Sequence, residues 1–387
     1  MIVCSAVFTA CSTTNIGPEV RASSANASSG VARPYQVVYD FKNVPDAATP
    51  FDGLTEVDGA FYGTAYSGGS EVGAVFTVAP DGAESVLYDF KRGADGAKPF
   101  GGLTAVNGLL YGTTQEGGTK SDGTVFSITT SGTETVLHSF SGGQDGEYPR
   151  SDLTSIGRLL YGTTFLGGSS QNGTVFEIGA TQPEKILHRF RGGSDGAHPY
   201  SSLTAVNGLL FGTTSEGGGA GNYGTIFEIT MSGQESVFYR FKGGADGAQP
   251  IAALTRVGNK LYGTTRLGGA RGVGTVFTIT TSGVKTVLYS FQGSPDGAKP
   301  LSKLAVVGGE LFGTTSAGGT NGYGTVYKID ENGAEVVLHR FNEAHGRGPI
   351  GRLVYAKGQL YGTTAWGGGN PRKNGPICCG VVYKVTP

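Results

Sequence analysis

The chain has 387 residues, a formal net charge of −1 and 15% charged residues. This weak and balanced charge provides no basic surface for a phosphate backbone, so we expect no nucleic-acid partner. The sequence has no run of about 18 apolar residues, so we expect no membrane-spanning helix. The 69 glycines follow no Gly-X-Y period and short alternating apolar runs recur, which excludes collagen and general disorder.

The first 34 residues differ in composition from the rest of the chain. Residues 1–11 are apolar with small residues near the end, like the second half of a secretory signal. The stretch Phe8-Thr9-Ala10-Cys11 resembles a bacterial lipobox, although Phe8 replaces the usual Leu, Val or Ile and no basic residues precede it. We therefore predict export and a lipid anchor on Cys11, the only membrane attachment that we expect. Residues 12–34, rich in Ser, Ala, Asn and Thr, are expected to form a flexible tether, with a plain disordered tail as the alternative.

A seven-fold repeat organises residues 35–387. Its clearest motif is Leu-Tyr-Gly-Thr-Thr at residues 110–114, which recurs six more times with small changes. A period this regular indicates a repeat architecture before any single residue is interpreted. The aromatic residue of this motif recurs at intervals of 49 to 51 residues, at Tyr62, Tyr111, Tyr161, Phe211, Tyr262, Phe312 and Tyr361.

Each repeat has the pattern of four short strands. In the second copy, residues 103–106 and 109–114 are apolar segments separated by Asn107-Gly108, a pair that favours a type I′ hairpin turn. A glycine-rich loop over residues 115–122 leads to two further segments, at 123–128 and 134–140. Four antiparallel strands in about 50 residues are the unit of a β-propeller blade.

The two ends of the repeat region predict a closed ring. Residues 35–41 match the fourth strand of a repeat, whereas residues 380–385 match the third strand. The last copy therefore lacks its own fourth strand, and the N-terminal strand can complete it. An open solenoid would instead need polar caps at its ends. The sequence predicts an all-β, seven-bladed β-propeller with four-stranded antiparallel blades over residues 35–387.

The repeated motifs resemble those of a bacterial tandem-repeat family, the GloVer (Gloeo/Verruco) repeat. Leu-Tyr-Gly-Thr-Thr stands at residues 261–265, Gly-Thr-Val-Phe at 274–277 and Asp-Gly-Ala-x-Pro at 246–250. The resemblance extends over residues 35–387 and implies an exported bacterial protein with one of several kinds of surface anchor. It implies no biochemical activity, because propellers host hydrolases, lyases, lectins and binding scaffolds alike.

Most repeated polar residues have a structural explanation. The Asp-Gly pairs between repeats suit turns in which Asp accepts backbone N–H groups, and their spacing lacks the alternating carboxylates of a calcium loop. His138, His188 and His339 occupy a fourth-strand position where other copies carry tyrosine, so we expect them to pack at the outer strand. We therefore expect neither a bound metal nor a cofactor.

Ligand contacts are expected on the face that carries the longer loops. In a propeller, the segments between repeats and the loops after the second strands share one face. The copies differ there, which gives this face aromatic and charged side chains suited to sugar rings and hydroxyls; the alternative is drift at solvated positions. The seventh copy has the longest such loop, residues 365–379, with the only tryptophan. The ligand-binding candidates are Tyr66, Glu116, Phe165, Glu216, Arg266, Trp366, His345 and Arg347.

Catalytic signals are few. The sequence has no His-Glu-x-x-His and no phosphate loop. The best catalytic group is His198, Tyr200, Arg150 and Glu147, on adjacent segments between repeats. We therefore predict a monomeric, exported propeller that binds a glycan or a surface protein on its glycine-rich face. The alternatives are a polysaccharide lyase or glycoside hydrolase with its site at the axial mouth, and a structural scaffold for protein contacts.

Overall fold

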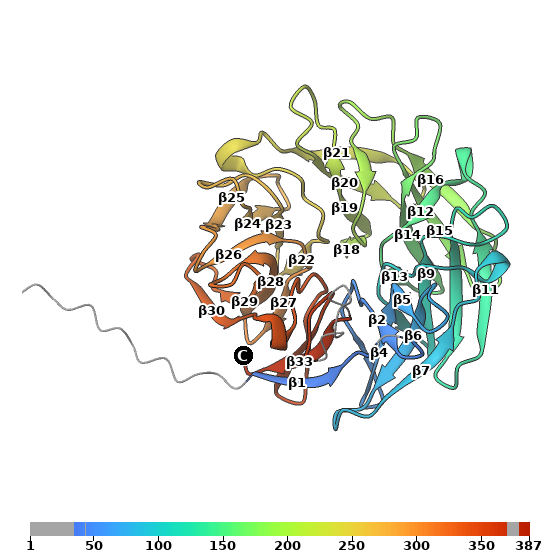
Figure 1. Ribbon diagram of the computed structural model, residues 1–387. Helices are drawn as coiled ribbons and strands as arrows, with labels where there is room; N and C mark the ends of the chain where they lie inside the picture. Colours follow the sequence, from blue (N-terminus) through green and yellow to red (C-terminus); the bar gives the residue numbers. More distant parts are fainter. Residues whose placement is uncertain (1–34, 43, 370–378) are drawn as a thin grey trace, which may run out of the picture. The chain divides into compact units, whose positions relative to one another are not determined.

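The computed structural model describes residues 35–42, 44–369 and 379–387. The lipobox-like segment with Cys11 and the expected tether over residues 12–34 lie outside the described residues. The described chain forms seven antiparallel sheets of four main strands each, arranged as the blades of a ring (Figure 1). The predicted all-β, seven-bladed propeller is therefore confirmed. Within these ranges no helix is long and apolar enough to cross a membrane.

The four main strands of each blade follow one another from the ring axis to the outer edge, and blades 1 to 7 are numbered by their copy of the repeat. The innermost strands are β3 (Thr55–Val57), β8 (Thr104–Val106), β13 (Thr154–Ile156), β18 (Thr204–Val206), β22 (Thr255–Val257), β27 (Ala305–Val307) and β31 (Val354–Ala356). The second strands are β4 (Ala60–Ala65), β9 (Leu109–Thr114), β14 (Leu159–Leu166), β19 (Leu209–Glu216), β23 (Lys260–Thr265), β28 (Glu310–Gly318) and β32 (Gln359–Thr364). The third strands are β6 (Ala74–Val78), β10 (Thr124–Thr129), β15 (Thr174–Gly179), β20 (Thr225–Thr230), β24 (Thr275–Thr280), β29 (Thr325–Ile329) and β33 (Val381–Val385). The fourth strands are β7 (Glu84–Asp89), β11 (Glu134–Ser139), β16 (Lys185–Arg189), β21 (Glu235–Arg240), β25 (Lys285–Ser290), β30 (Glu335–Arg340) and, in blade 7, β1 (Tyr35–Asp40).

The turns follow the predicted chemistry. Asn107 and Gly108, between β8 and β9, have φ values of 50° and 80°, as a type I′ turn requires. The segments between blades contain only short elements. These are β2 (Ala47–Ala48), β12 (Glu147–Pro149), β17 (Ala197–Pro199), β26 (Gly297–Pro300) and the 3-10 helices η1 (Gly93–Asp95), η2 (Gly143–Asp145), η3 (Gly244–Asp246) and η4 (Glu343–His345). β5 (Ser67–Gly68) lies in the loop after the second strand of blade 1 and pairs with β2.

The hydrophobic clusters lie between neighbouring blades. Tyr111, Val125 and Phe140 of blade 2 pack with Leu160 and Phe176 of blade 3, and all five side chains are buried. Burial of one such apolar side chain contributes about 1.5–3 kcal/mol relative to its exposure. Each blade therefore depends on its two neighbours for its core.

The Leu-Tyr-Gly-Thr-Thr motif lies on the second strand of each blade. Its glycine makes room for the aromatic side chain of the third strand, because a Cβ on Gly162 would lie 2.4 Å from the ring of Phe176. Its last threonine joins the second and third strands, as where Oγ1 of Thr164 and Oγ1 of Thr174 lie 2.8 Å apart. The motif therefore fixes how the second and third strands of a blade pack together, which agrees with the expected structural role.

The N-terminal strand closes the ring. β1 pairs antiparallel with β33, with Tyr35 opposite Val385 and Val37 opposite Tyr383. Directly after β1, the buried ring of Phe41 lies 5.0 Å from the ring of Phe76 in blade 1. The predicted completion of blade 7 by the N-terminal strand is confirmed.

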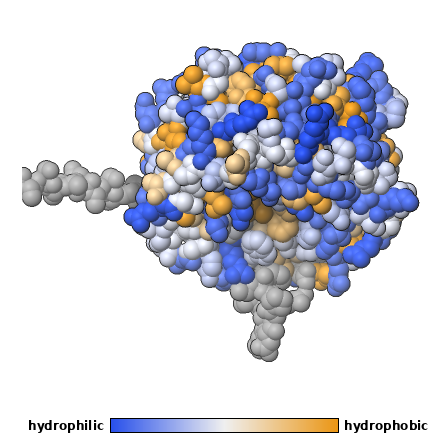
Figure 2. Space-filling model, turned by 90° about the horizontal axis from the view of Figure 1, so that it is seen from above, coloured by the Kyte–Doolittle hydropathy of each residue, from blue (hydrophilic) through white to orange (hydrophobic). Residues whose placement is uncertain are grey.

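Figure 2 shows the ring from its edge, with apolar residues scattered among polar and charged ones. Scattered apolar residues of this kind are common on protein surfaces and do not mark an interface. The copies differ from one another around the ring axis, among other places.

Candidate functional site

The segments between blades and the loops after the second strands meet on one face, as predicted. β12 pairs with β14, β17 with β19 and β26 with β28. In other blades the same contact is a single bridge, such as Ala97 to Glu116 and Arg347 to Trp366. This pairing holds both sets of loops together on what we call the glycine-rich face.

An axial cavity of about 100 Å³ lies where the segments between blades approach the ring axis. Two positions of the repeat supply most of its lining, counted back from the leucine that precedes each innermost strand. The rim residues, three positions before that leucine, are Phe51, Phe100, Arg150, Tyr200, Ile251, Leu301 and Ile350. The floor residues, directly before it, are Asp152, Ser202, Ala253, Lys303 and Arg352.

The rings of Phe51, Phe100 and Tyr200 line the cavity, and further aromatic rings on the same face contact them. The ring centroid of Phe51 lies 5.9 Å from that of Trp366 and 4.9 Å from that of Phe100. The ring of Phe100 lies 5.5 Å from that of Tyr200, at an interplanar angle of 89°. The guanidinium of Arg150 lies among these rings, where it gains from cation–π attraction. We call this set the aromatic arc, and it consists of Phe51, Tyr66, Phe100, Phe165, Tyr200 and Trp366.

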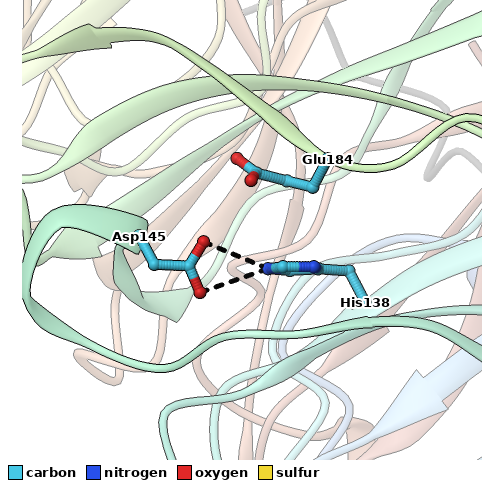
Figure 3. A group of neighbouring side chains, drawn as sticks. All are labelled: His138, Asp145 and Glu184. Atoms are coloured by element: carbon cyan, nitrogen blue, oxygen red, sulfur yellow. Dashed lines mark hydrogen bonds and ion pairs between the residues drawn. The ribbon is translucent and has the colours of Figure 1, made fainter.

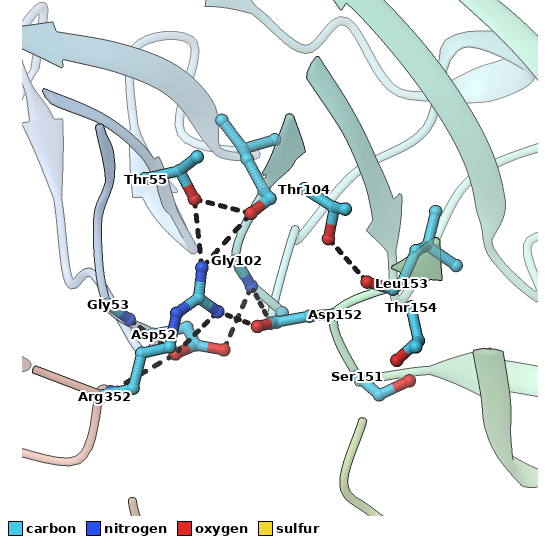
Figure 4. A network of polar contacts seen from close by, with 12 residues as sticks. Asp52, Gly53, Thr55, Gly102, Thr104, Ser151, Asp152, Leu153, Thr154 and Arg352 are labelled. Atoms are coloured by element: carbon cyan, nitrogen blue, oxygen red, sulfur yellow. Dashed lines mark hydrogen bonds and ion pairs between the residues drawn. The ribbon is translucent and has the colours of Figure 1, made fainter. Parts of the chain in front are cut away.

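The cavity floor is a polar network between segments that are far apart in the sequence (Figure 4). Arg352 forms an ion pair with Asp152, and its Nη2 donates to Oγ1 of Thr55 at 3.0 Å. The amide of Gly102 donates to Asp152 at 2.6 Å and to Asp52 at 3.1 Å. These groups precede or begin the innermost strands of blades 1, 2, 3 and 7, so the network ties four blades together at the axis.

Lys303 is the floor cation without a fixed partner. In the part of the chain that the structure describes, no acceptor lies within hydrogen-bond or ion-pair distance of its ammonium group. Burial lowers the pKa of Lys303, while the Asp52 carboxylate raises it. The residue is half-buried and its ammonium group is not among the fully buried polar atoms without a partner, so an anionic ligand in the cavity could reach it and pair with its charge. Lys303 therefore makes the floor a candidate position for an anionic group.

Only two of the four catalytic candidates line the cavity. Arg150 and Tyr200 are rim residues, whereas His198 and Glu147 are not among the lining residues. Burial raises the pKa of Tyr200, so its phenol stays protonated at neutral pH and is a poor general base. The four side chains therefore do not form one catalytic group around the cavity.

His198 belongs to a neighbouring contact on the same face. Its ring stacks on Phe165 with the centroids 4.9 Å apart. Its Nδ1 lies 3.4 Å from Oε2 of Glu216, close enough for an ion pair when the imidazole is protonated. The guanidinium of Arg150 also contacts the ring of Phe165, at 4.1 Å from its centroid.

Most of the ligand-binding candidates lie in or beside the aromatic arc. Tyr66, Phe165 and Trp366 are members of the arc. The other candidates beside the arc are Glu116, Glu216, Arg266 and Arg347. Three of them, Glu116, Glu216 and Arg347, take part in the pairing between the two sets of loops. Arg266 contacts a residue of the segment between blades.

His345 lies away from the aromatic arc. Its ring is 4.8 Å from that of Tyr35, which in turn stacks at 3.8 Å on His339 of the outer strand β30. The preceding segment of this copy is one residue shorter than in most others, so His345 takes the position that an aspartate occupies elsewhere. It therefore belongs to the outer edge of blades 6 and 7.

Polar groups also recur at the outer edge, between neighbouring blades, and we call them edge clusters. An aromatic residue of a fourth strand contacts the aspartate that follows it, and a glutamate that begins the next fourth strand lies beside both. Figure 3 shows one cluster, formed by His138, Asp145 and Glu184. The backbone amide four residues before the aspartate also donates to it, which confirms the expected turn role of these aspartates.

The glutamates of the edge clusters have unusually high pKa values. Burial is the main cause, and the negative charge of the neighbouring aspartate adds to it. The pKa is raised to about 7 for Glu84, Glu134, Glu184, Glu235 and Glu335.

We expect the propeller to lose stability as the pH rises from about 5 to about 8. A carboxyl group with a pKa of about 7 in the folded chain and 4.5 in the unfolded chain binds its proton more tightly when folded. Its stabilising contribution is complete below pH 4.5 and is lost as the pH passes 7. Thermal unfolding at several pH values would show a Tm that falls by several degrees. A variant with glutamine at the five positions should lose most of this dependence, and a Tm that rises over the same interval would contradict the assignment.

The comparisons with known proteins agree with the fold. A model of the Gloeobacter/Verrucomicrobia repeat family matches residues 27–176 and 159–378. No curated protein matches the chain. A solved structure from Bacteroides uniformis, of a protein proposed to be a 6-phosphogluconolactonase, is 14% identical, with a TM-score of 0.55 over 80% of this chain and 89% of that chain. Another, from Bacteroides fragilis, is 16% identical, with a TM-score of 0.51 over 80% and 87%. At such identities the likeness shows a shared fold alone.

Proposed function

The chain belongs to the Gloeobacter/Verrucomicrobia repeat family, and we propose that this member binds a carbohydrate at the mouth of its axial cavity. The observation that carries the proposal is the aromatic arc, of which Phe51, Phe100 and Tyr200 line a cavity of about 100 Å³. Aromatic rings stack on the C–H faces of sugars, and nearby polar groups can bind the hydroxyls. Both kinds of group are available here within one concave surface.

The exposure of the arc supports a role in binding. Trp366 is 39% exposed although its ring contacts Phe51, so part of its surface is free to accept a ligand. The contacts of Arg150 with three arc rings hold its guanidinium and these rings in place. Rings that are held by one another lose little freedom when a ligand binds, which favours affinity.

The floor supports a preference for acidic sugars. Lys303 offers an ammonium group with no partner among the described residues, and Arg352 is already engaged by Asp152. A carboxylate or phosphate on the ligand would form a charge-assisted hydrogen bond with Lys303, which is stronger than the bond that a hydroxyl of a neutral sugar could accept. We therefore propose that a negatively charged group of the sugar points to the floor.

The geometry gives less support to catalysis. His198 and Glu147 do not line the cavity, and Tyr200 stays protonated at neutral pH because burial raises its pKa. A lyase would need a base that reaches the substrate, and a glycoside hydrolase would need two carboxyl groups on either side of it. The cavity lining has the carboxylates of Asp52 and Asp152, and both already accept hydrogen bonds from Gly102.

A glycan array with neutral and acidic oligosaccharides, followed by calorimetry, tests the proposal. Trp366→Ala and Phe100→Ala should each weaken binding about tenfold or more, because each removes a stacking surface. Tyr223→Ala is the matched control, since Tyr223 is also 39% exposed but makes no ring contact with the arc. Equal loss in the control, or no bound glycan, would overturn the proposal. Turnover of the bound glycan, followed as new ultraviolet absorbance or reducing ends, would favour the enzymatic alternative.

Export and lipid attachment at Cys11 stay predictions, because that cysteine lies outside the described residues. Radiolabelled palmitate should enter the native chain in a bacterial host and should not enter Cys11→Ser. A surface protein as the partner is the remaining alternative for the glycine-rich face. It would gain support if the glycan array were empty while arc variants still lost binding to intact cells.

A further inference from the structure

The edge clusters differ from blade to blade in a way that bears on metal binding. Four of them use a tyrosine, two use His138 or His188, and the seventh has no carboxylate. In one of the tyrosine clusters, Lys285 replaces the glutamate and pairs with Asp246 at 3.0 Å. The repeat therefore offers several versions of the same site within one chain.

In the histidine clusters the aromatic side chain lies farther from the aspartate carboxylate than in the tyrosine clusters. The four tyrosine hydroxyls donate to their aspartates over 2.5 to 3.0 Å, which are normal hydrogen bonds. Nε2 of His138 lies 3.3 Å from both carboxylate oxygens of Asp145, and Nε2 of His188 lies 3.4 Å from Oδ2 of Asp195. These separations exceed the usual upper length of about 3.2 Å for an N–H···O bond.

The same separations fit a tetrahedral metal ion. Zinc bonds to nitrogen and oxygen of about 2.0–2.2 Å place neighbouring ligand atoms about 3.3–3.6 Å apart. In both histidine clusters the three ligand atoms lie within 4.8 Å of one another. In the second cluster, Oε2 of Glu235 lies 3.8 Å from Nε2 of His188. Small side-chain rotations would therefore bring all three groups into the first coordination sphere.

A glutamate oxygen without a hydrogen-bond partner is present in both histidine clusters, as it is at Glu84, Glu134 and Glu335 of the tyrosine clusters. The side chain of Glu235 is only 6% exposed, and its Oε1 is buried without a hydrogen-bond partner. Oε1 of Glu184 is likewise buried and unpartnered. A buried carboxylate oxygen without a donor must bind a proton or a cation. In the tyrosine clusters only the proton is available, because a phenol hydrogen-bonded to aspartate is not a metal ligand at neutral pH.

We propose that the clusters His138–Asp145–Glu184 and His188–Asp195–Glu235 each bind one divalent transition-metal ion, with zinc as the best match to one imidazole and two carboxylates. The aspartates are held in place by the amides of Ser141 and Arg191, which donate over 2.7 Å. Such support fixes the orientation of a metal ligand. Each ion joins the fourth strands of neighbouring blades, so the pair links blade 2 to blade 3 and blade 3 to blade 4. This site is independent of the proposed carbohydrate site.

Calorimetry with zinc chloride on the full chain, freed of metal by a chelator, tests the proposal at pH 7.5. We expect two zinc ions per chain. His138→Tyr and His188→Tyr should each remove one ion, and the double variant should remove both. His339→Tyr is the matched control, because its cluster contains no carboxylate, and it should still bind two ions. Cobalt in place of zinc should give the strong visible absorption of tetrahedral coordination, and the double variant should abolish it.

The tyrosine variants are expected to fold, because tyrosine occupies the same position in four other copies. If one of them unfolds, Glu184→Lys and Glu235→Lys provide the second test, since they copy the Lys285–Asp246 pair. Failure to bind zinc with a Kd below about 1 mM would overturn the proposal. Zinc binding that survives in the double variant, with the fold intact, would overturn it as well.

Discussion

A chain that begins at Lys42, and therefore lacks β1, is expected to lose the cooperative unfolding of the ring. β1 pairs with β33 over its length, and Phe41 beside it is fully buried. Removal of both exposes the edge of β33 and opens the core between blades 7 and 1. The loss of the buried Phe41, at about 1.5–3 kcal/mol, together with the half-buried side chains of β1 is a large fraction of the stability of any domain. Thermal unfolding followed by circular dichroism should show a Tm lower by at least about 10 °C, or a broad transition.

The matched control for this truncation begins at Arg33, so it keeps β1 and removes only the segment before it. Its Tm should equal that of the full chain within about 1 °C, because it keeps β1 and Phe41, which complete blade 7 and its contact with blade 1. A synthetic peptide of residues 33–42, added to the shorter chain, should restore part of the lost Tm. Equal stability of the two truncated chains would contradict closure of the ring by β1.

The second large effect is expected for Arg352→Met at the cavity floor. Arg352 pairs with Asp152, and its side chain is 20% exposed while that of Asp152 is 11% exposed. Removal of the guanidinium leaves Asp152 and Asp52 near each other with their charges unmatched. Breaking a buried ion pair from one side costs about 3 kcal/mol or more, so we expect the free energy of unfolding to fall by about 3 kcal/mol. Urea unfolding of the variant and the native chain measures this difference.

A double-mutant cycle separates this ion pair from general loss of packing. Arg352→Met combined with Asp152→Asn should be less destabilised than the sum of the two single variants, because the second change removes the uncompensated charge. Arg271→Met is the control, since Arg271 is exposed and the change should lie within about 0.5 kcal/mol of the native chain. Additive effects of the two floor variants would show that the charges at the axis are not coupled.

The candidate site was only partly predictable from the sequence. The positions where the copies differ led to Tyr66, Phe165 and Trp366, and the structure brings these rings into one arc. The floor residues were missed, although a signal for them exists. The residue directly before the leucine of each innermost strand changes from Asp152 to Lys303 between copies, a charge difference at one repeated position. The charge difference indicates a binding site only when the position is known to face the ring axis, and the sequence alone does not show this.

His345 shows the opposite case. The sequence places it in the segment between blades 6 and 7, beside Arg347, and so on the expected binding face. In the structure it stacks on Tyr35, which is about 300 residues away in the chain and arrives there only because β1 closes the ring. Sequence periodicity assigns a residue to a loop, but it does not say which side of that loop faces a neighbour.

The sequence alone determined the number of blades, the four-stranded unit and the closing strand. These follow from local patterns, since turn residues and the alternation of apolar side chains act over a few residues and are repeated seven times. Only the tertiary structure decided which side chains meet across the ring. The ion pair of Arg352 with Asp152 and the histidine clusters join residues from different copies. Their distances depend on how neighbouring blades pack, and no short-range pattern encodes that packing.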